Sequence, residues 1–143
     1  AQLGMSLGMA LTGKVVISIY PRFDFLLLAM NQLVNHLDKL EDFTHGQFKA
    51  RVIIRVGVGS TSPLYPGVQH CGDYTEGLRK IVDLPVIRPL KSEYILPIYQ
   101  TAYARGHSIP EYIPIECQRI YQKAYSPHLS TIIVEDMNLY GTT

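Results

Sequence analysis

Residues 14–20 read KVVISIY and residues 51–56 read RVIIRV, and these two short stretches decide the fold class. Both are rich in β-branched residues and mostly apolar, which is typical of strands buried on both faces of a sheet. Residues 84–88 (LPVIR), 112–116 (YIPIE) and 131–135 (TIIVE) have the same character. The sequence therefore predicts a sheet built from five short strands.

Helical segments alternate with these strands. Helices are expected over residues 1–12, 24–40, 73–81 and 92–105. The second is the clearest, because leucines recur at helical spacings and form an apolar stripe. The stripe consists of Leu26, Leu33, Leu37 and Leu40. Gly13 should end the first helix, Ser92 should cap the last one, and Pro97 should bend it.

Strands that alternate with helices predict an α/β fold, in which helices cover both faces of a mostly parallel sheet as a three-layer sandwich. The chain of 143 residues is long enough for one domain, and residues 1–143 are expected to form it. The predicted core includes Leu7, Val16, Ile17, Leu33, Ile53, Ile54, Val86, Ile98 and Ile115.

Composition excludes several classes of partner. The net charge is +1, and the thirteen basic residues form no cluster, which argues against nucleic-acid binding. The longest apolar run, residues 25–30, is far too short to span a membrane. Two cysteines make neither a disulfide framework nor a metal-binding spacing. Because nothing indicates secretion, we expect a cytoplasmic protein with no membrane or nucleic-acid partner.

Common catalytic and cofactor motifs are absent. There is no phosphate-binding loop, no nucleophile elbow and no zinc-binding motif. Gly57 and Gly59 follow a predicted strand, but the third glycine and the following helix of a dinucleotide site are missing. The sequence gives no indication of a metal site.

Two residues are candidates for a site, and each has an ordinary structural explanation beside the functional one. His70 lies in a glycine-rich loop next to Cys71, without an identifiable carboxylate to orient it, so it is either an ordinary loop histidine or part of a site. Phe25, beside a predicted strand end, is either core or part of a site at the carboxyl ends of the strands. The other histidines are expected at the surface or in turns: His36, His45, His107 and His128.

Several segments together resemble a known family. Residues 1–13 (AQLGMSLGMALTG) resemble the small-residue helix of the pyrimidine-binding module in transketolase-like enzymes, in particular the beta subunits of pyruvate and branched-chain 2-oxoacid dehydrogenases. As in that family, a buried strand and an aromatic-rich turn follow. Residues 25–32 (FLLLAMNQ) then resemble the family's Phe-x-x-Gln-Ala-(apolar)-(Asp/Asn)-Gln helix start.

Three more segments follow in the same order. Residues 51–55 (RVIIR) match the family's next strand, and the loop after them ends in Gln69-His70, like the family's Gln-His-Ser-Gln. Residues 89–92 (PLKS) fit its strand-to-helix turn. Residues 114–121 (PIECQRIY) resemble its Pro-Val-x-x-x-Glu-x-(Lys/Arg)-x-Leu-Tyr strand with a shorter spacing. The resemblance covers roughly residues 1–125. Each motif is short, but all five occur in the same order as in the family.

The resemblance implies thiamine diphosphate as the cofactor. In this family the module supplies a glutamate to the aminopyrimidine and an aromatic residue that stacks on it. A different module holds the diphosphate and Mg²⁺ through a Gly-Asp-Gly…Asn motif, which this sequence lacks. By position, Phe25 is the implied stacking ring and His70 the implied catalytic histidine near the thiazolium. A flat ring suits a pyrimidine face, and histidine titrates near neutrality.

The sequence departs from the family in three places. Leu28 stands where the family has glutamine. The catalytic glutamate would precede Ala1, so we expect the sequence to be incomplete at its N-terminus. Residues 131–141 (TIIVEDMNLYG) resemble the family's first strand, which belongs before the opening helix. Either the order is permuted or this similarity arises by chance.

The resemblance implies a beta-subunit-like module that acts on a 2-oxo acid or a ketose and is inactive alone. Its expected partners are a diphosphate-binding, alpha-like chain and a second copy of itself. Ten tyrosines and the apolar loop at residues 62–66 favour such interfaces. Two alternatives remain open: a non-catalytic assembly or regulatory module with the same fold, and an unrelated flavodoxin-like binder of a small ligand.

Overall fold

A four-stranded parallel sheet forms the centre of the molecule in the computed structural model, which describes residues 1–59, 62, 64–104 and 128–140. The strands are β1 (Val15–Tyr20), β2 (Arg51–Val58), β3 (Val86–Ile87) and β4 (Thr131–Asp136), in the order β1-β2-β4-β3. In the register, Ile53 of β2 lies between Ile17 of β1 and Thr131 of β4. The predicted α/β class with a parallel sheet is confirmed. The strand expected over residues 112–116 lies outside the described residues.

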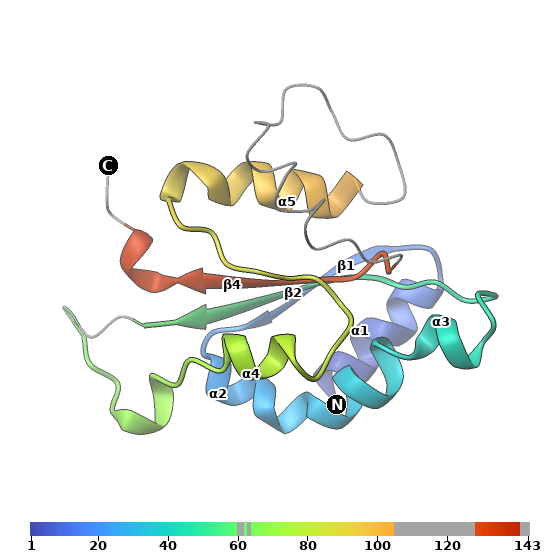
Figure 1. Ribbon diagram of the computed structural model, residues 1–143, viewed down its shortest axis with the longest axis horizontal. Helices are drawn as coiled ribbons and strands as arrows, with labels where there is room; N and C mark the ends of the chain where they lie inside the picture. The colour runs from blue at the N-terminus through green and yellow to red at the C-terminus, as the bar shows by residue number, and fades with distance from the viewer. Residues whose placement is uncertain (60–61, 63, 105–127, 141–143) are drawn as a thin grey trace.

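Helices cover both faces of the sheet, so the described chain has three layers (Figure 1). One face carries α5 (Ile95–Ala104). The other carries α1 (Gln2–Leu11), α2 (Phe23–Leu26), α3 (Leu40–Phe43) and α4 (Thr75–Arg79). Shorter helical turns are η1 (Leu27–Ala29), η2 (Gln32–Leu37), η3 (Val68–His70), η4 (Ser92–Tyr94) and η5 (Met137–Leu139).

The helix expected over residues 24–40 is a series of short segments instead. Its leucine stripe is buried as predicted, with Leu26 and Leu33 fully inaccessible to solvent. The break lies at η2, a π-helix in which the Asp38 amide donates to the Leu33 carbonyl oxygen (2.9 Å). A π turn holds more residues than an α turn, so positions beyond it are rotated. Asp38 is thereby buried, and its Oδ1 accepts from the amides of Asp83 and Leu84 (both 2.9 Å).

Within the described residues, α5 covers only part of its face of the sheet. Ile98 and Ala102 of α5 pack on Ile53 and Ile133, in the middle of the sheet. Ile17 of β1 is 51% exposed, so its predicted burial, and that of residues 14–20 on both faces, is wrong. The reason is topological: β1 is an edge strand of the described sheet, and the α5 cluster packs on Ile53 and Ile133 and reaches only Val15 of β1.

The remaining core predictions are mostly confirmed. Leu33, Ile53, Ile54, Val86 and Ile98 are buried, Leu7 and Val16 are partly buried, and Ile115 lies outside the described residues. His128 was expected at the surface but is buried, because it leads into the central strand β4; its Nδ1 lies 3.7 Å from Oε1 of Glu41. His36 and His45 are exposed as expected, and His107 lies outside the described residues.

Some of the predicted helix and strand ends agree with the structure, and others are shifted. Gly13 follows α1 with φ of +87°, a conformation that glycine adopts without strain. α4 and β3 are shorter than the segments predicted for them. Lys91, rather than Ser92, stands at the N-terminal cap of the turn that leads into α5, and Pro97 lies inside that helix.

Gly57 provides a test of the packing between β1 and β2. A Cβ atom at Gly57 would lie 2.6 Å from the carbonyl oxygen of Pro21, a backbone atom that cannot move aside. We expect Gly57→Ala to lower the free energy of unfolding by about 1–3 kcal/mol, measured by urea denaturation. Gly8→Ala is the matched control, because nothing lies within 4 Å of its added Cβ. In a helix that change should be neutral or stabilising by up to about 1 kcal/mol. Equal effects of both changes would contradict the proposed close approach.

Candidate functional site

The candidate site lies at the edge where the parallel strands end. β1, β2 and β4 point the same way, so the segments that follow them meet at one side of the sheet, on the left of Figure 1. Open α/β sheets bind ligands outside the carboxyl ends of their strands. The segment after β1 leads into α2, and the segment after β2 leads through η3 to α4.

Phe25 and His70, the two residues singled out from the sequence, lie next to each other at this edge. Phe25 belongs to α2 and His70 ends η3, and their ring centroids are 5.3 Å apart with a 52° tilt. The Phe25 ring is 39% exposed. Nδ1 of His70 is buried and has no hydrogen-bond partner among the described residues. The fold thus presents a partly exposed flat ring beside an imidazole with an unused nitrogen.

Contacts between α2 and the residues after η3 hold this pair in place. The Tyr74 hydroxyl donates to Oδ1 of Asp24 (3.1 Å), and this bond raises the pKa of Tyr74. The Tyr74 ring also packs edge-on against Phe23, with centroids 5.5 Å apart. Phe23 is fully buried under the sheet, so it anchors the segment that carries Phe25.

Leu28, which stands where the resembling family has glutamine, lies at the surface. Its side chain is 88% exposed, in the turn that follows α2. Within the described residues no group of three histidine, cysteine or acidic side chains could hold a metal ion.

Arg22 crosses from the β1 segment to the β2 segment at this edge. It stands at the N-terminal cap of α2, and its Nη1 donates to the carbonyl oxygen of Gly59 (2.7 Å). Gly59 has φ of +76°. A Cβ atom there would lie 3.1 Å from Oδ1 of Asp136, the last residue of β4. The segments that follow β1, β2 and β4 are therefore in close contact.

Arg88, which follows β3, joins two further segments. Its guanidinium pairs with Asp73 and, at 3.0 Å, with Asp136. Asp73 also accepts from the amide of Thr75 (3.0 Å), where α4 begins. Burial alone would raise the pKa of Asp73, but the hydrogen bonds from Thr75 and the charge of Arg88 outweigh it and lower that pKa. The charges of Arg88, Asp73 and Asp136 are thus paired with one another inside the protein.

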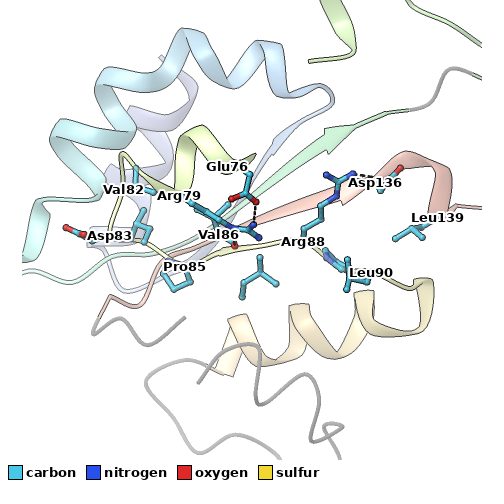
Figure 2. Close-up of a pocket in the computed structure, with 13 residues that line it drawn as sticks. Glu76, Arg79, Val82, Asp83, Pro85, Val86, Arg88, Leu90, Asp136 and Leu139 are labelled. Carbon is cyan, nitrogen blue, oxygen red and sulfur yellow. Dashed lines mark hydrogen bonds and ion pairs between the residues drawn. The ribbon is translucent and has the colours of Figure 1, made fainter. Parts of the chain in front are cut away.

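A cavity of about 890 Å³ lies along β3 (Figure 2). Its walls are largely apolar, and Arg79 and Arg88 line it. Figure 2 shows Arg79 beside Glu76 and Arg88 beside Asp136, so both guanidinium groups are already neutralised. Neither Phe25 nor His70 lines this cavity. It therefore does not correspond to the site expected from the sequence.

Sequence reasoning assigned no role to Glu135, which the structure places in a buried charge network under α5. Glu135 is 2% exposed and accepts hydrogen bonds from Arg55 (Nε, 2.8 Å), Tyr99 and Tyr140. Burial would raise the pKa of Glu135, but these donors hold it below its usual value. In turn the carboxylate raises the pKa of Arg55. The only sequence signal was an acidic residue in an apolar strand, TIIVED. The Glu135 carboxylate is thus fully engaged by donors from β2, α5 and the turn after β4, which indicates a structural role.

Comparison with known protein families and with curated proteins gives no match for this chain. In the part of the chain that the structure describes, no helix combines the length and apolar character needed to cross a membrane.

Removing the charge of Glu135 should destabilise the fold in a pH-dependent way. We expect Glu135→Gln to cost about 3 kcal/mol at pH 7, because Arg55 loses its buried partner. Since the pKa of Glu135 is lower in the folded state than its ordinary value of 4.5, the ionised carboxylate stabilises the fold above that pH. This contribution disappears as the pH falls through the folded-state pKa. Thermal unfolding from pH 7 to pH 3 should therefore show wild type and variant converging.

The matched control is Glu76→Gln, which removes an equal charge from a 79% exposed side chain paired with Arg79. Exposed ion pairs contribute little, so its effect should stay within about 0.5 kcal/mol at every pH. A Glu135 variant that unfolds like this control would show that the buried network does not stabilise the chain.

Proposed function

We propose that this chain is the pyrimidine-binding, beta-subunit-like module of a thiamine-diphosphate enzyme acting on a 2-oxo acid or a ketose. The observation that carries the proposal is the contact between Phe25 and His70, with ring centroids 5.3 Å apart at the carboxyl edge of a parallel sheet. The family resemblance assigns these two residues to one site, although they are distant in sequence. Their contact is what that assignment requires.

The residues present fit one part of the cofactor. The partly exposed ring of Phe25 offers a flat apolar face of the kind that stacks on a pyrimidine. The imidazole of His70 lies against this ring, with centroids 5.3 Å apart. In this proposal Mg²⁺ and the diphosphate are held by a second module.

When bound, thiamine diphosphate supplies an electron sink for breaking a bond next to a carbonyl group. This chain's contribution is to bind and orient the aminopyrimidine. Phe25 fixes the plane of the ring, since Phe23 and Tyr74 hold its helix against the sheet. His70 contacts the Phe25 ring, with centroids 5.3 Å apart, and so lies where it would face the bound cofactor.

A second candidate is a non-catalytic assembly or regulatory module that keeps the fold. Leu28 favours it, because an 88% exposed leucine replaces a polar contact to the cofactor. Both candidates require assembly with a second chain or a second copy, which sedimentation at high protein concentration would detect. The two differ in whether the Phe25 ring binds a pyrimidine.

A fragment titration separates the two candidates. The 4-aminopyrimidine portion of thiamine, without thiazolium or diphosphate, is titrated into the ¹⁵N,¹³C-labelled chain and followed by NMR. We expect millimolar binding that shifts the ring signals of Phe25 and His70, because one stacked ring contributes only about 0.5–1.5 kcal/mol beyond burial. Phe25→Ala should abolish these shifts. Phe48→Ala is the control, since Phe48 is also exposed (53%) but precedes β2 at the opposite end of the strand.

Calorimetry with intact thiamine diphosphate and Mg²⁺ supplies the second measurement. The chain alone should show no micromolar affinity, which requires about 8 kcal/mol of binding free energy. Micromolar binding would mean that a complete cofactor site exists elsewhere in this chain. If the fragment leaves the Phe25 and His70 signals unchanged, the proposal fails and the assembly module replaces it.

A further inference from the structure

We propose that Arg22 binds the anionic group of the substrate, so that the substrate is a carboxylate or a phosphate ester rather than a neutral ketose. This inference rests on the proposed function, because it places the substrate beside the ring that binds the pyrimidine. It concerns a residue that no motif of the sequence singled out.

The first argument is position. Arg22 is the N-terminal cap residue of α2, and the Phe25 amide donates to its carbonyl oxygen (3.1 Å). Arg22 and Phe25 therefore both belong to the first turn of α2, at the end of β1. The Phe25 ring contacts His70, so the guanidinium, the ring and the imidazole belong to one edge of the sheet.

The second argument is charge. Arg55, Arg79 and Arg88 each lie within ion-pair distance of a carboxylate. Arg22, by contrast, forms no ion pair within the described residues, and its hydrogen bond goes to the neutral carbonyl oxygen of Gly59 (2.7 Å). A guanidinium has five N–H donors in a planar fork that matches carboxylate and phosphate oxygens. One donor is used, so several remain for an anion.

The third argument is preorganisation. The carbonyl oxygen of Pro21, next to Arg22, lies so close to Gly57 that no side chain would fit between them. This contact and the bond from Arg22 to Gly59 tie the segment after β1 to the end of β2. Arg22 is also half-buried, so less water screens its charge. A fixed, unneutralised and partly desolvated guanidinium binds an anion at low cost in conformational entropy.

The alternative explanation is that Arg22 only clamps the two segments together. The test therefore compares Arg22→Gln with Arg79→Gln, its matched control. Arg79 also donates to a backbone carbonyl oxygen, that of Val86 (3.2 Å), but its charge is paired with Glu76. Both variants lose the same charge and the same kind of backbone bond. Thermal unfolding of each variant checks that it is folded before binding is measured.

The probes are sodium pyruvate, fructose 6-phosphate and neutral dihydroxyacetone, titrated at constant ionic strength and followed by the side-chain Nε signal of Arg22. We expect one of the two anions to shift this signal with saturation, whereas dihydroxyacetone should not. Arg22→Gln should raise the dissociation constant for that anion at least tenfold. For this variant, binding is measured from the ring signals of Phe25 and His70. Arg79→Gln should change it less than twofold. Arg22→Lys, which keeps the charge without the fork, should lie between them.

The anion that saturates the site identifies the substrate class, a 2-oxo acid or a phosphorylated ketose. Equal binding by wild type and Arg22→Gln, equal binding of the neutral triose, or no response to either anion would each overturn the inference. If Arg22→Gln does not fold, the inference is tested by the affinity of Arg22→Lys for the anion and by titration of the three probes into the wild type. The aminopyrimidine titration contains no anion, so its failure would affect the proposed function and leave this measurement unaffected.

Discussion

Parallel pairing of β2 with both of its neighbours is the constraint on which the rest of the structure depends. Because the strands run in one direction, every segment that leaves them at the carboxyl end has to share the same small region. Phe25, His70 and Arg22 come from two such segments, and they meet there without any local sequence pattern linking them. The contact of Gly57 with Pro21 shows how tightly these segments are packed. A site at this edge follows from the direction of the strands.

Charged residues of the described chain differ in whether their partners are charged or neutral. Glu135 and Arg88 have their partners inside the protein, and their networks join strands to helices. Such charges stabilise the fold, and since their hydrogen bonds are made internally, they offer little to a ligand. Arg22 differs, because its partner is neutral and its charge is not compensated within the described residues. Electrostatics therefore separates residues that hold the sheet together from a residue that is free to bind.

Much of the fold could be predicted from local pattern, since runs such as RVIIRV have few other stable arrangements than a buried strand. The leucine stripe also identified its buried face, although not the π turn that carries Asp38 inward, because that turn depends on hydrogen bonds to a distant loop. Ile17 is exposed for a reason that only the strand order reveals. For the site, the resemblance pointed to Phe25 and His70. Arg22 and Glu135 could not be found from the sequence, because their roles depend on partners far along the chain.

The position of β4 has a consequence for how the chain acquires its structure. β4 comes last among the described strands, yet it lies between β2 and β3, which both precede it in the sequence. During synthesis β2 and β3 emerge from the ribosome without the strand that joins them, and they expose apolar edges until it arrives. Sheets closed by such non-local pairing fold slowly, and their unpaired strands are prone to aggregation. Truncation anywhere before β4 should therefore leave nascent chains dependent on chaperones, even though most of the residues of the core are already present.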